Sequence, residues 1–161
     1  ISVRPERYSY HMIEESGEFV INLTTEQLAH ATDYCGVRSG RDVDKWKEMH
    51  LTEGQASKLD YAPIIEECPV NIECKVTEIK ELGSHHMFLA KVEAVQVGEE
   101  YLDEKGRLQL GKAGLLAYSH GEYLTLGDSL GTFGWSVRKN TSSKKKKKNI
   151  RKGSSSKKQK K

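Results

Sequence analysis

The sequence predicts a mainly β domain of the α+β class: a small antiparallel β-barrel with short inserted helices. Two long stretches, residues 70–82 and 88–97, alternate apolar and polar side chains and predict strands that dominate the chain. Within the second stretch the apolar positions change parity between Ala94 and Val95. This change predicts a bulge in a long, bending strand, which a barrel requires. The chain has no internal repeat, and short helical segments separate its strands.

The first 23 residues predict strand, turn, helix and strand in that order. Ile1-Ser-Val3 alternates like a strand, and because a strand needs a partner we expect preceding sequence, so that the N-terminal strands of the barrel are missing. Residues 4–7 contain a proline and predict a turn. Ser9 is expected to cap a short helix that ends at Gly17. Residues 18–23 are rich in β-branched and aromatic side chains and predict the next strand.

The middle of the chain predicts two more short helices. One is expected to begin at Thr24 or Thr25 and to end near Cys35-Gly36, and Asp42 is expected to begin the other. Residues 53–63 carry weak signals and predict a loop. The remaining expected elements are a break at 83–85, a turn at 103–106, a last strand over 121–126, and a closing loop marked by glycines 127, 131 and 134.

The composition divides the chain into a folded domain, residues 1–139, and a lysine-rich tail, residues 140–161. The tail holds 11 of the 26 basic residues and none of the 23 acidic ones, and Ile150 is its only large apolar residue. Because so little apolar surface cannot offset the entropy of ordering, we predict that the tail is disordered. The domain carries a net charge of −8. Phosphate contacts need clustered Lys and Arg, so nucleic acid is expected to bind only through the tail.

The cysteines and the hydropathy indicate a cytoplasmic location. Cys35, Cys68 and Cys74 form no CxxC pair and leave one thiol over in any pairing, and no signal peptide precedes them. Both features are typical of a reducing compartment. No run approaches the roughly 20 apolar residues that span a bilayer, so we expect no membrane partner.

Arg4, Arg7 and Ser9 are candidate anion ligands. Two guanidinium groups and a hydroxyl beside a helix N-terminus suit a phosphate, but spacing alone favours solvated surface charges. No P-loop or GxGxxG pattern accompanies them, which disfavours a Rossmann nucleotide fold. Cys35 and Ser39 belong to the runs Tyr34-Cys-Gly36 and Ser39-Gly40, whose backbone N–H groups are candidate donors to an anion, and residues 37–40 form a basic, glycine-containing loop. No base is evident beside Cys35, so a structural thiol is favoured over a nucleophile.

His85 and His86 follow the break between the two long strands. Adjacent histidines of a strand point to opposite faces, and no further ligand lies at metal-binding spacing, so no metal site is expected. His85 either contacts a ring-shaped ligand or is an ordinary hairpin histidine. The run Tyr118-Ser-His-Gly-Glu-Tyr123 lacks the G-x-S-x-G pattern of a hydrolase elbow, which disfavours serine hydrolysis.

Taken in order, seven segments resemble the flavin reductase-like family, in particular flavoredoxin and its relatives. Together they span about residues 1–139. They are Ser2-Val-Arg-Pro-Glu-Arg-Tyr-Ser-Tyr10, Gly17-Glu-Phe-Val-Ile-Asn22, Ala31-Thr-Asp-Tyr-Cys-Gly36, Ser39-Gly-Arg-Asp-Val-Asp-Lys45, Glu67-Cys-Pro-Val-Asn-Ile-Glu-Cys74, Gly83-Ser-His85 and Tyr118-Ser-His-Gly-Glu-Tyr123.

The resemblance implies an FMN-binding split β-barrel that forms a homodimer, with FMN near the subunit interface. The segment with Arg4, Arg7 and Ser9 matches the one that approaches the flavin phosphate. Gly83-Ser-His85 matches a Gly-Asp-His element beside the flavin ring, with Ser84 in place of the aspartate. The other flavin-binding elements of the family, a Thr/Ser-rich strand and an Asn-Pro-Pro loop, would lie upstream of this sequence.

The activity that the resemblance implies is transfer of reducing equivalents from NAD(P)H to flavin, or through bound FMN to a redox partner protein. Because the flavin carries the reaction, we expect no catalytic acid–base pair. One alternative is an FMN-binding electron carrier without reductase turnover. The other is a polyanion-binding protein that acts through its basic tail.

Overall fold

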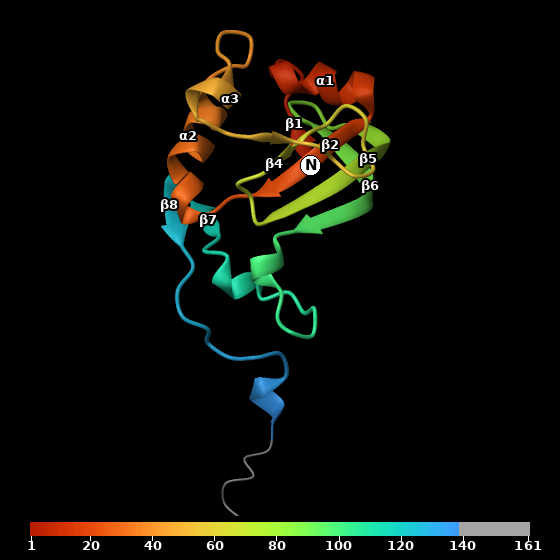
Figure 1. Ribbon diagram of the computed structural model, residues 1–161. Helices are drawn as coiled ribbons and strands as arrows, with labels where there is room; N and C mark the ends of the chain where they lie inside the picture. Colours follow the sequence, from red (N-terminus) through yellow and green to blue (C-terminus); the bar gives the residue numbers. More distant parts are fainter. Residues whose placement is uncertain (139–161) are drawn as a thin grey trace, which may run out of the picture. The chain divides into compact units, whose positions relative to one another are not determined.

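A four-stranded antiparallel sheet in the order β1-β6-β5-β2 organises the first unit of the chain, residues 1–126 (Figure 1). Its strands are β1 (Ser2–Val3), β2 (Glu18–Leu23), β5 (Val70–Glu81) and β6 (His86–Val97). The computed structural model describes residues 1–138, so the predicted tail, residues 140–161, lies outside the described part. All four strands occur where the sequence predicts them.

Bulges bend the long β5–β6 hairpin. The register shifts after the pair formed by Glu73 and Ala94, so that Glu93 is an extra residue of β6. This position lies next to the change of parity in the sequence, and the predicted bulge is confirmed. A second shift leaves Thr77 of β5 without a partner in the register. Bulges increase the local twist and bend a strand, which gives this hairpin the curvature of a barrel wall.

Two short hairpins and three short helices complete the unit. The hairpins are β3–β4 (Glu53–Gly54 and Ile64–Ile65) and β7–β8 (Leu116–Ser119 and Glu122–Thr125), so the predicted loop over 53–63 contains a strand. The helices are α1 (Tyr8–Ser16), α2 (Ala29–Val37) and α3 (Lys45–Glu48). Single 3-10 turns of this unit occupy Glu26–Leu28, Glu99–Tyr101 and Leu110–Lys112, and the second unit, which begins at Gly127, contains one at Trp135–Val137. No helix within residues 1–138 has the length and apolar character to cross a bilayer.

The start of α1 differs from the prediction, and its end agrees. Arg7 occupies the N-cap position, no side chain caps the helix, and Ser9 lies inside the first turn. The reason is the preceding proline turn, in which the Arg7 N–H donates to the Arg4 carbonyl at 3.0 Å and brings the chain into helical geometry early. At the other end the N–H of Gly17, at φ +67°, donates to the Ile13 carbonyl at 2.9 Å.

The N-cap of the short helix α3 lies two residues after the predicted aspartate, Asp42. Asp44 is the N-cap, and its Oδ1 accepts a hydrogen bond from the Lys47 N–H at 3.2 Å. The N–H of Asp42 instead donates to the Ser39 carbonyl at 3.1 Å and closes a turn before the helix. Sequence spacing offers two equivalent aspartates, and only this turn decides between them.

Helix α1 covers one face of the sheet (Figure 1). The buried cluster on this face joins Tyr10 of α1 to Phe19, Cys74 and Phe88 of three strands. Tyr10 also places its hydroxyl 2.8 Å from Nδ1 of His86. This packing fixes the position of α1, and therefore of the turn before it, relative to the sheet.

The segment between β3 and β4 covers the opposite face, where two buried carboxylates of the sheet bind its backbone. Glu73 of β5 has no exposed surface and accepts hydrogen bonds from the N–H and hydroxyl of Ser57, the N–H of Lys58 and the amide of Gln96, at 2.7 to 2.9 Å. Burial raises the pKa of Glu73, but these hydrogen bonds outweigh it and bring the pKa below its ordinary value.

Glu18 of β2 binds the same segment further along. Its Oε2 accepts from the N–H groups of Asp60 and Tyr61 at 2.9 and 2.8 Å, and Lys75 lies 3.4 Å from its Oε1. These bonds again outweigh burial, and the pKa of Glu18 is lowered. Apolar packing under this segment involves Ala56, Leu59 and Ile64. Both faces of the sheet are thus covered.

The run Tyr118–Tyr123, which lacks the pattern of a hydrolase elbow, forms the tip of the β7–β8 hairpin. Ser119 pairs with Glu122, and the two residues between them, His120 and Gly121, both have positive φ, of 49° and 88°. This is the geometry of a tight two-residue hairpin turn. The glycine and histidine therefore serve the turn.

Candidate functional site

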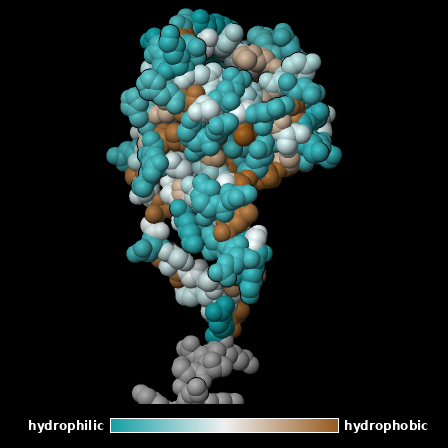
Figure 2. Space-filling view, in the orientation of Figure 1, coloured by the Kyte–Doolittle hydropathy of each residue, from teal (hydrophilic) through white to brown (hydrophobic). Residues whose placement is uncertain are grey.

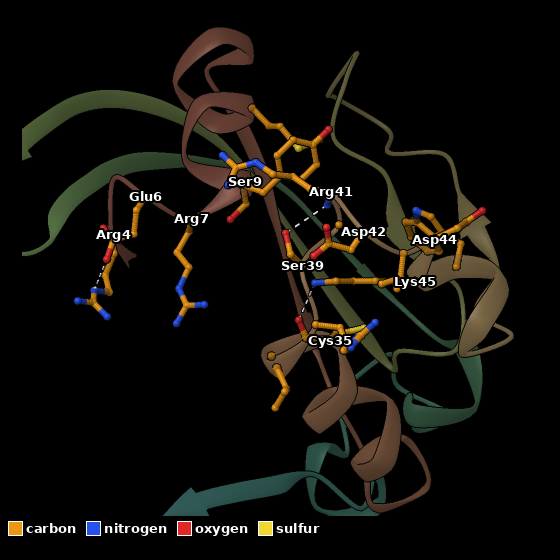
Figure 3. A pocket seen from close by; sticks show the side chains of 18 residues that line it. Arg4, Glu6, Arg7, Ser9, Cys35, Ser39, Arg41, Asp42, Asp44 and Lys45 are labelled. Carbon is orange, nitrogen blue, oxygen red and sulfur yellow. Dashed lines mark hydrogen bonds and ion pairs between the residues drawn. The ribbon is translucent and has the colours of Figure 1, made fainter.

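An open cleft of about 1200 Å³ lies between the turn that precedes α1 and the segment that links α2 to α3 (Figure 3). Five of the six predicted cofactor residues line it, from two distant parts of the chain: Arg4, Arg7, Ser9, Cys35 and Ser39. The packing of α1 on the sheet and the course of α2 bring these parts together. The structure therefore unites most of the predicted site.

The α1 side of the cleft carries two arginines. Arg4 Nε lies 3.0 Å from Glu6 Oε1, whereas no carboxylate of residues 1–138 forms an ion pair with Arg7. Figure 3 shows both guanidinium groups extending in the same direction from the turn. Because no side chain caps α1, its N-terminal N–H groups and the positive end of the helix dipole add to their field. This side favours an anion.

The opposite side is a loop held in shape by internal hydrogen bonds. Ser39 Oγ accepts from the Arg41 N–H at 3.2 Å, and the Cys35 carbonyl accepts from Lys45 Nζ at 2.6 Å (Figure 3). Lys45 thus fastens α3 to the end of α2. Through these bonds Ser39 shapes the loop, and the Cys35 carbonyl anchors it.

Tyr8 joins the two sides of the cleft. The guanidinium carbon of Arg41 lies 5.2 Å from the centre of the Tyr8 ring, within the range of a cation–π contact. Gly40 lies against the same ring, and a Cβ at this position would be 3.1 Å from Tyr8 Cδ1. A glycine here lets the loop approach α1 closely. The sequence-based site contains none of these three residues, although the basic, glycine-containing loop hints at them.

The cleft collects positive charge in an acidic domain. Residues 1–139 contain 15 basic and 23 acidic residues. Five of those basic residues line this cleft together with three acidic ones: Arg4, Arg7, Arg38, Arg41 and Lys45 against Glu6, Asp42 and Asp44. A local excess of positive charge on a negative body attracts anionic ligands to this position.

His85, the sixth predicted residue, does not line the cleft. It is exposed in the turn between β5 and β6, where its Nδ1 lies 3.0 Å from Ser84 Oγ. Pairing of Val3 with His86 puts this turn at the end of the sheet where Arg4 begins the α1 turn. The histidine that contacts α1 is the neighbouring His86. The side chain of His86 points to the core face and meets the Tyr10 hydroxyl there.

A smaller, mainly apolar cavity of about 420 Å³ lies between α2 and β2, and Cys35 lines both spaces. Cys68 also lines this cavity. Burial, with a contribution from the charge of Glu67, raises the pKa of the Cys68 thiol to about 11. Burial likewise raises the pKa of Cys74. These two thiols are protonated at neutral pH and are poor nucleophiles.

The family model described as flavin reductase like domain matches residues 1–127. An uncharacterized protein of Archaeoglobus fulgidus is 31% identical over 105 residues, which are 65% of this chain and 59% of the relative. The chain thus spans less than two thirds of the length of that relative.

Solved structures resemble the chain over most of its length. A flavoredoxin of Methanosarcina acetivorans superposes with a TM-score of 0.76 at 31% identity, covering 86% of this chain and 75% of the other. An FMN-binding protein of Thermus thermophilus has a TM-score of 0.68 at 26% identity, covering 82% and 71%. A split barrel domain protein of Shewanella frigidimarina, at 20% identity, matches in fold with a TM-score of 0.72, covering 84% and 69%. The predicted mainly β split barrel is confirmed.

Proposed function

Because the chain belongs to the flavin reductase-like family, we propose that it is an FMN-binding oxidoreductase. It transfers reducing equivalents from NAD(P)H to flavin, or through bound FMN to a redox partner protein. The observation that supports this most directly is the positively charged cleft at the uncapped start of α1, where Arg7 has no carboxylate partner among residues 1–138. A phosphate monoester fits such a site in charge and in hydrogen-bonding chemistry.

In this proposal the protein holds and orients the flavin. Arg7, with Arg4 and Ser9 beside it, binds the phosphate, and Glu6 keeps the Arg4 side chain in place. The first N–H groups of α1 complete the phosphate site. Bound flavin supplies the ring that accepts and donates electrons. The protein therefore needs accurate placement of the ligand more than an acid–base pair.

We further propose that the protein works in the cytoplasm as a homodimer. All three cysteines are free thiols, as in a reducing compartment. Val92 and Val95 of β6 expose 53% and 51% of their surface, and Figure 2 shows apolar residues among hydrophilic ones on the surface of the domain. A second copy that covers such residues would remove them from water.

The protein should purify yellow, with the absorption spectrum of FMN, and should oxidise NADH or NADPH when flavin is present. Absorbance at the flavin band and consumption of the nicotinamide at its own band measure the two properties separately. FMN binding without nicotinamide consumption would identify an electron carrier. A colourless protein that neither takes up added FMN nor consumes NAD(P)H would refute the proposal.

We propose that residues 140–161 act separately from the flavin domain as a polyanion-binding segment. They carry eleven positive charges, whereas the remainder carries −8. Deleting them should abolish retention on heparin and leave FMN affinity unchanged, because the domain alone lacks the charge to bind a polyanion. Heparin chromatography at two salt concentrations, with an FMN titration of both proteins, tests this. Heparin retention of the shortened protein, or a loss of FMN affinity, would contradict it.

A further inference from the structure

Two cations of the cleft have no role in the phosphate site at α1. Arg38 and Arg41 come from the opposite side, and both are exposed. No carboxylate of residues 1–138 forms an ion pair with either, although Asp42 and Asp44 line the same cleft. Asp44 is already engaged as the cap of α3. Arg38 lies beside the Tyr34 hydroxyl, which donates to Glu48 at 2.7 Å, so Arg41 carries the less compensated charge of the two.

The loop that presents these arginines is well organised. The Arg38 N–H donates to the Tyr34 carbonyl at 2.9 Å, and the Arg41 N–H donates to Ser39 Oγ. The guanidinium of Arg41 lies over the Tyr8 ring at 5.2 Å, which leaves its N–H edges free to donate. A cation held in one orientation loses little entropy when it binds an anion.

The cleft also has room for more than a mononucleotide phosphate. Its volume of about 1200 Å³ exceeds the roughly 300–1,000 Å³ that is usual for the pocket of one small ligand. Arg4 and Arg7 project from the α1 turn, and Arg38 and Arg41 come from the opposing loop. One cleft thus has two groups of cations on facing walls.

We propose that Arg38 and Arg41 form a second phosphate subsite, which binds a phosphate of a dinucleotide while the α1 side holds the flavin phosphate. The proposal rests on the proposed flavin function and extends it to the second nucleotide. The shared chemistry is a nucleotide phosphate with two sources: the nicotinamide dinucleotide donor, or the adenylate half of FAD. Guanidinium groups bind phosphate through paired N–H donors, so either source suits these residues.

The decisive variant is the double substitution R38Q/R41Q, compared with the matched control K105Q/K112Q. The control removes the same charge from exposed positions outside the cleft. We expect R38Q/R41Q to weaken the binding of NADP⁺ to the FMN-loaded protein, or of FAD to the flavin-free protein, by about tenfold or more. The affinity for FMN should change by less than about threefold, and the control should change none of the three. Calorimetric titration of each ligand distinguishes the two sources.

Three further measurements make the result decisive. R41K keeps the charge but loses the planar, stacked guanidinium, and it should recover only part of the lost affinity. Melting curves of all variants identify any that fail to fold. Inorganic pyrophosphate is a flavin-free probe: the unaltered protein should bind it more tightly than R38Q/R41Q does, whether or not FMN binds.

Pyrophosphate binding that depends on Arg38 and Arg41 in a protein that binds no flavin would support the subsite while refuting the proposed function. Equal losses of FMN and dinucleotide affinity in R38Q/R41Q would show a single phosphate site and would overturn the second one. Unchanged binding of NADP⁺, FAD and pyrophosphate in a correctly folded double variant would also overturn the second phosphate subsite.

Discussion

Arg7→Ala should weaken FMN binding by about 10- to 150-fold and leave riboflavin binding nearly unchanged. A hydrogen bond to a charged group contributes about 1.5–3 kcal/mol, which corresponds to that range, and riboflavin has no phosphate to lose. Arg7 has no carboxylate partner among residues 1–138 and forms the N-cap position of α1. Fluorescence titration of the two flavins against the variant and the unaltered protein measures the difference.

The neighbouring arginine provides an internal comparison. Arg4 lies 3.0 Å from a carboxylate oxygen of Glu6, so part of its charge is already compensated. Arg4→Ala should therefore weaken FMN binding less than Arg7→Ala does, and Lys105→Gln, outside the cleft, should have no effect. Equal losses for FMN and riboflavin in Arg7→Ala would show that Arg7 acts through folding of the α1 turn instead of through the phosphate.

Glu73→Ala should lower the free energy of unfolding by about 2–4 kcal/mol. The substitution removes the charged acceptor of the part-buried N–H groups of Ser57 and Lys58 and of the Gln96 amide, and a lost hydrogen bond to a charged group costs about 1.5–3 kcal/mol before relaxation. Chemical denaturation followed by tryptophan fluorescence measures the loss. Glu78→Ala on the same strand, where the side chain is exposed, should change stability by less than about 0.5 kcal/mol.

The pH dependence of this loss follows from the lowered pKa of Glu73. The unfolded chain has an ordinary glutamate pKa of about 4.3, so the charged form contributes its full stability above that pH. The contribution disappears as the pH falls through the lower pKa of the folded state. The difference in the free energy of unfolding between the unaltered protein and Glu73→Gln should therefore be largest near neutral pH and should shrink below about pH 4. A difference that grew on acidification would contradict the role of the carboxylate.

The strands could be predicted from the sequence because their signal is local. Alternation over 70–82 and 88–97 reports which side chains share a face, and the change of parity beside Glu93 reports the bulge. The glycine at position 17 likewise ends α1 by its own freedom to adopt a positive φ. Each of these features depends on residues within one turn or one strand pair.

The starts of α1 and α3 and the second face of the sheet could not be predicted in the same way, whereas the predicted start at Thr25 is the N-cap of the 3-10 turn before α2. Ser9 and Asp42 have the chemistry of caps, but turns that close a few residues earlier determine that Arg7 and Asp44 occupy the positions. The alternation of apolar and polar residues in this strand predicts that the Glu73 side chain faces solvent. It is buried because the segment between β3 and β4, which has weak local signals, folds over it.

The sequence alone determined the mainly β class, the family, and five of the residues that line the cleft. Those residues occur in segments whose order and chemistry can be read along the chain. Only the tertiary structure decided what faces them: it brings Arg41 onto Tyr8 from the far wall, and leaves His85 in an exposed turn. Charges brought together from distant segments have no signal in local spacing, because their distance is set by how helices and loops pack on the sheet.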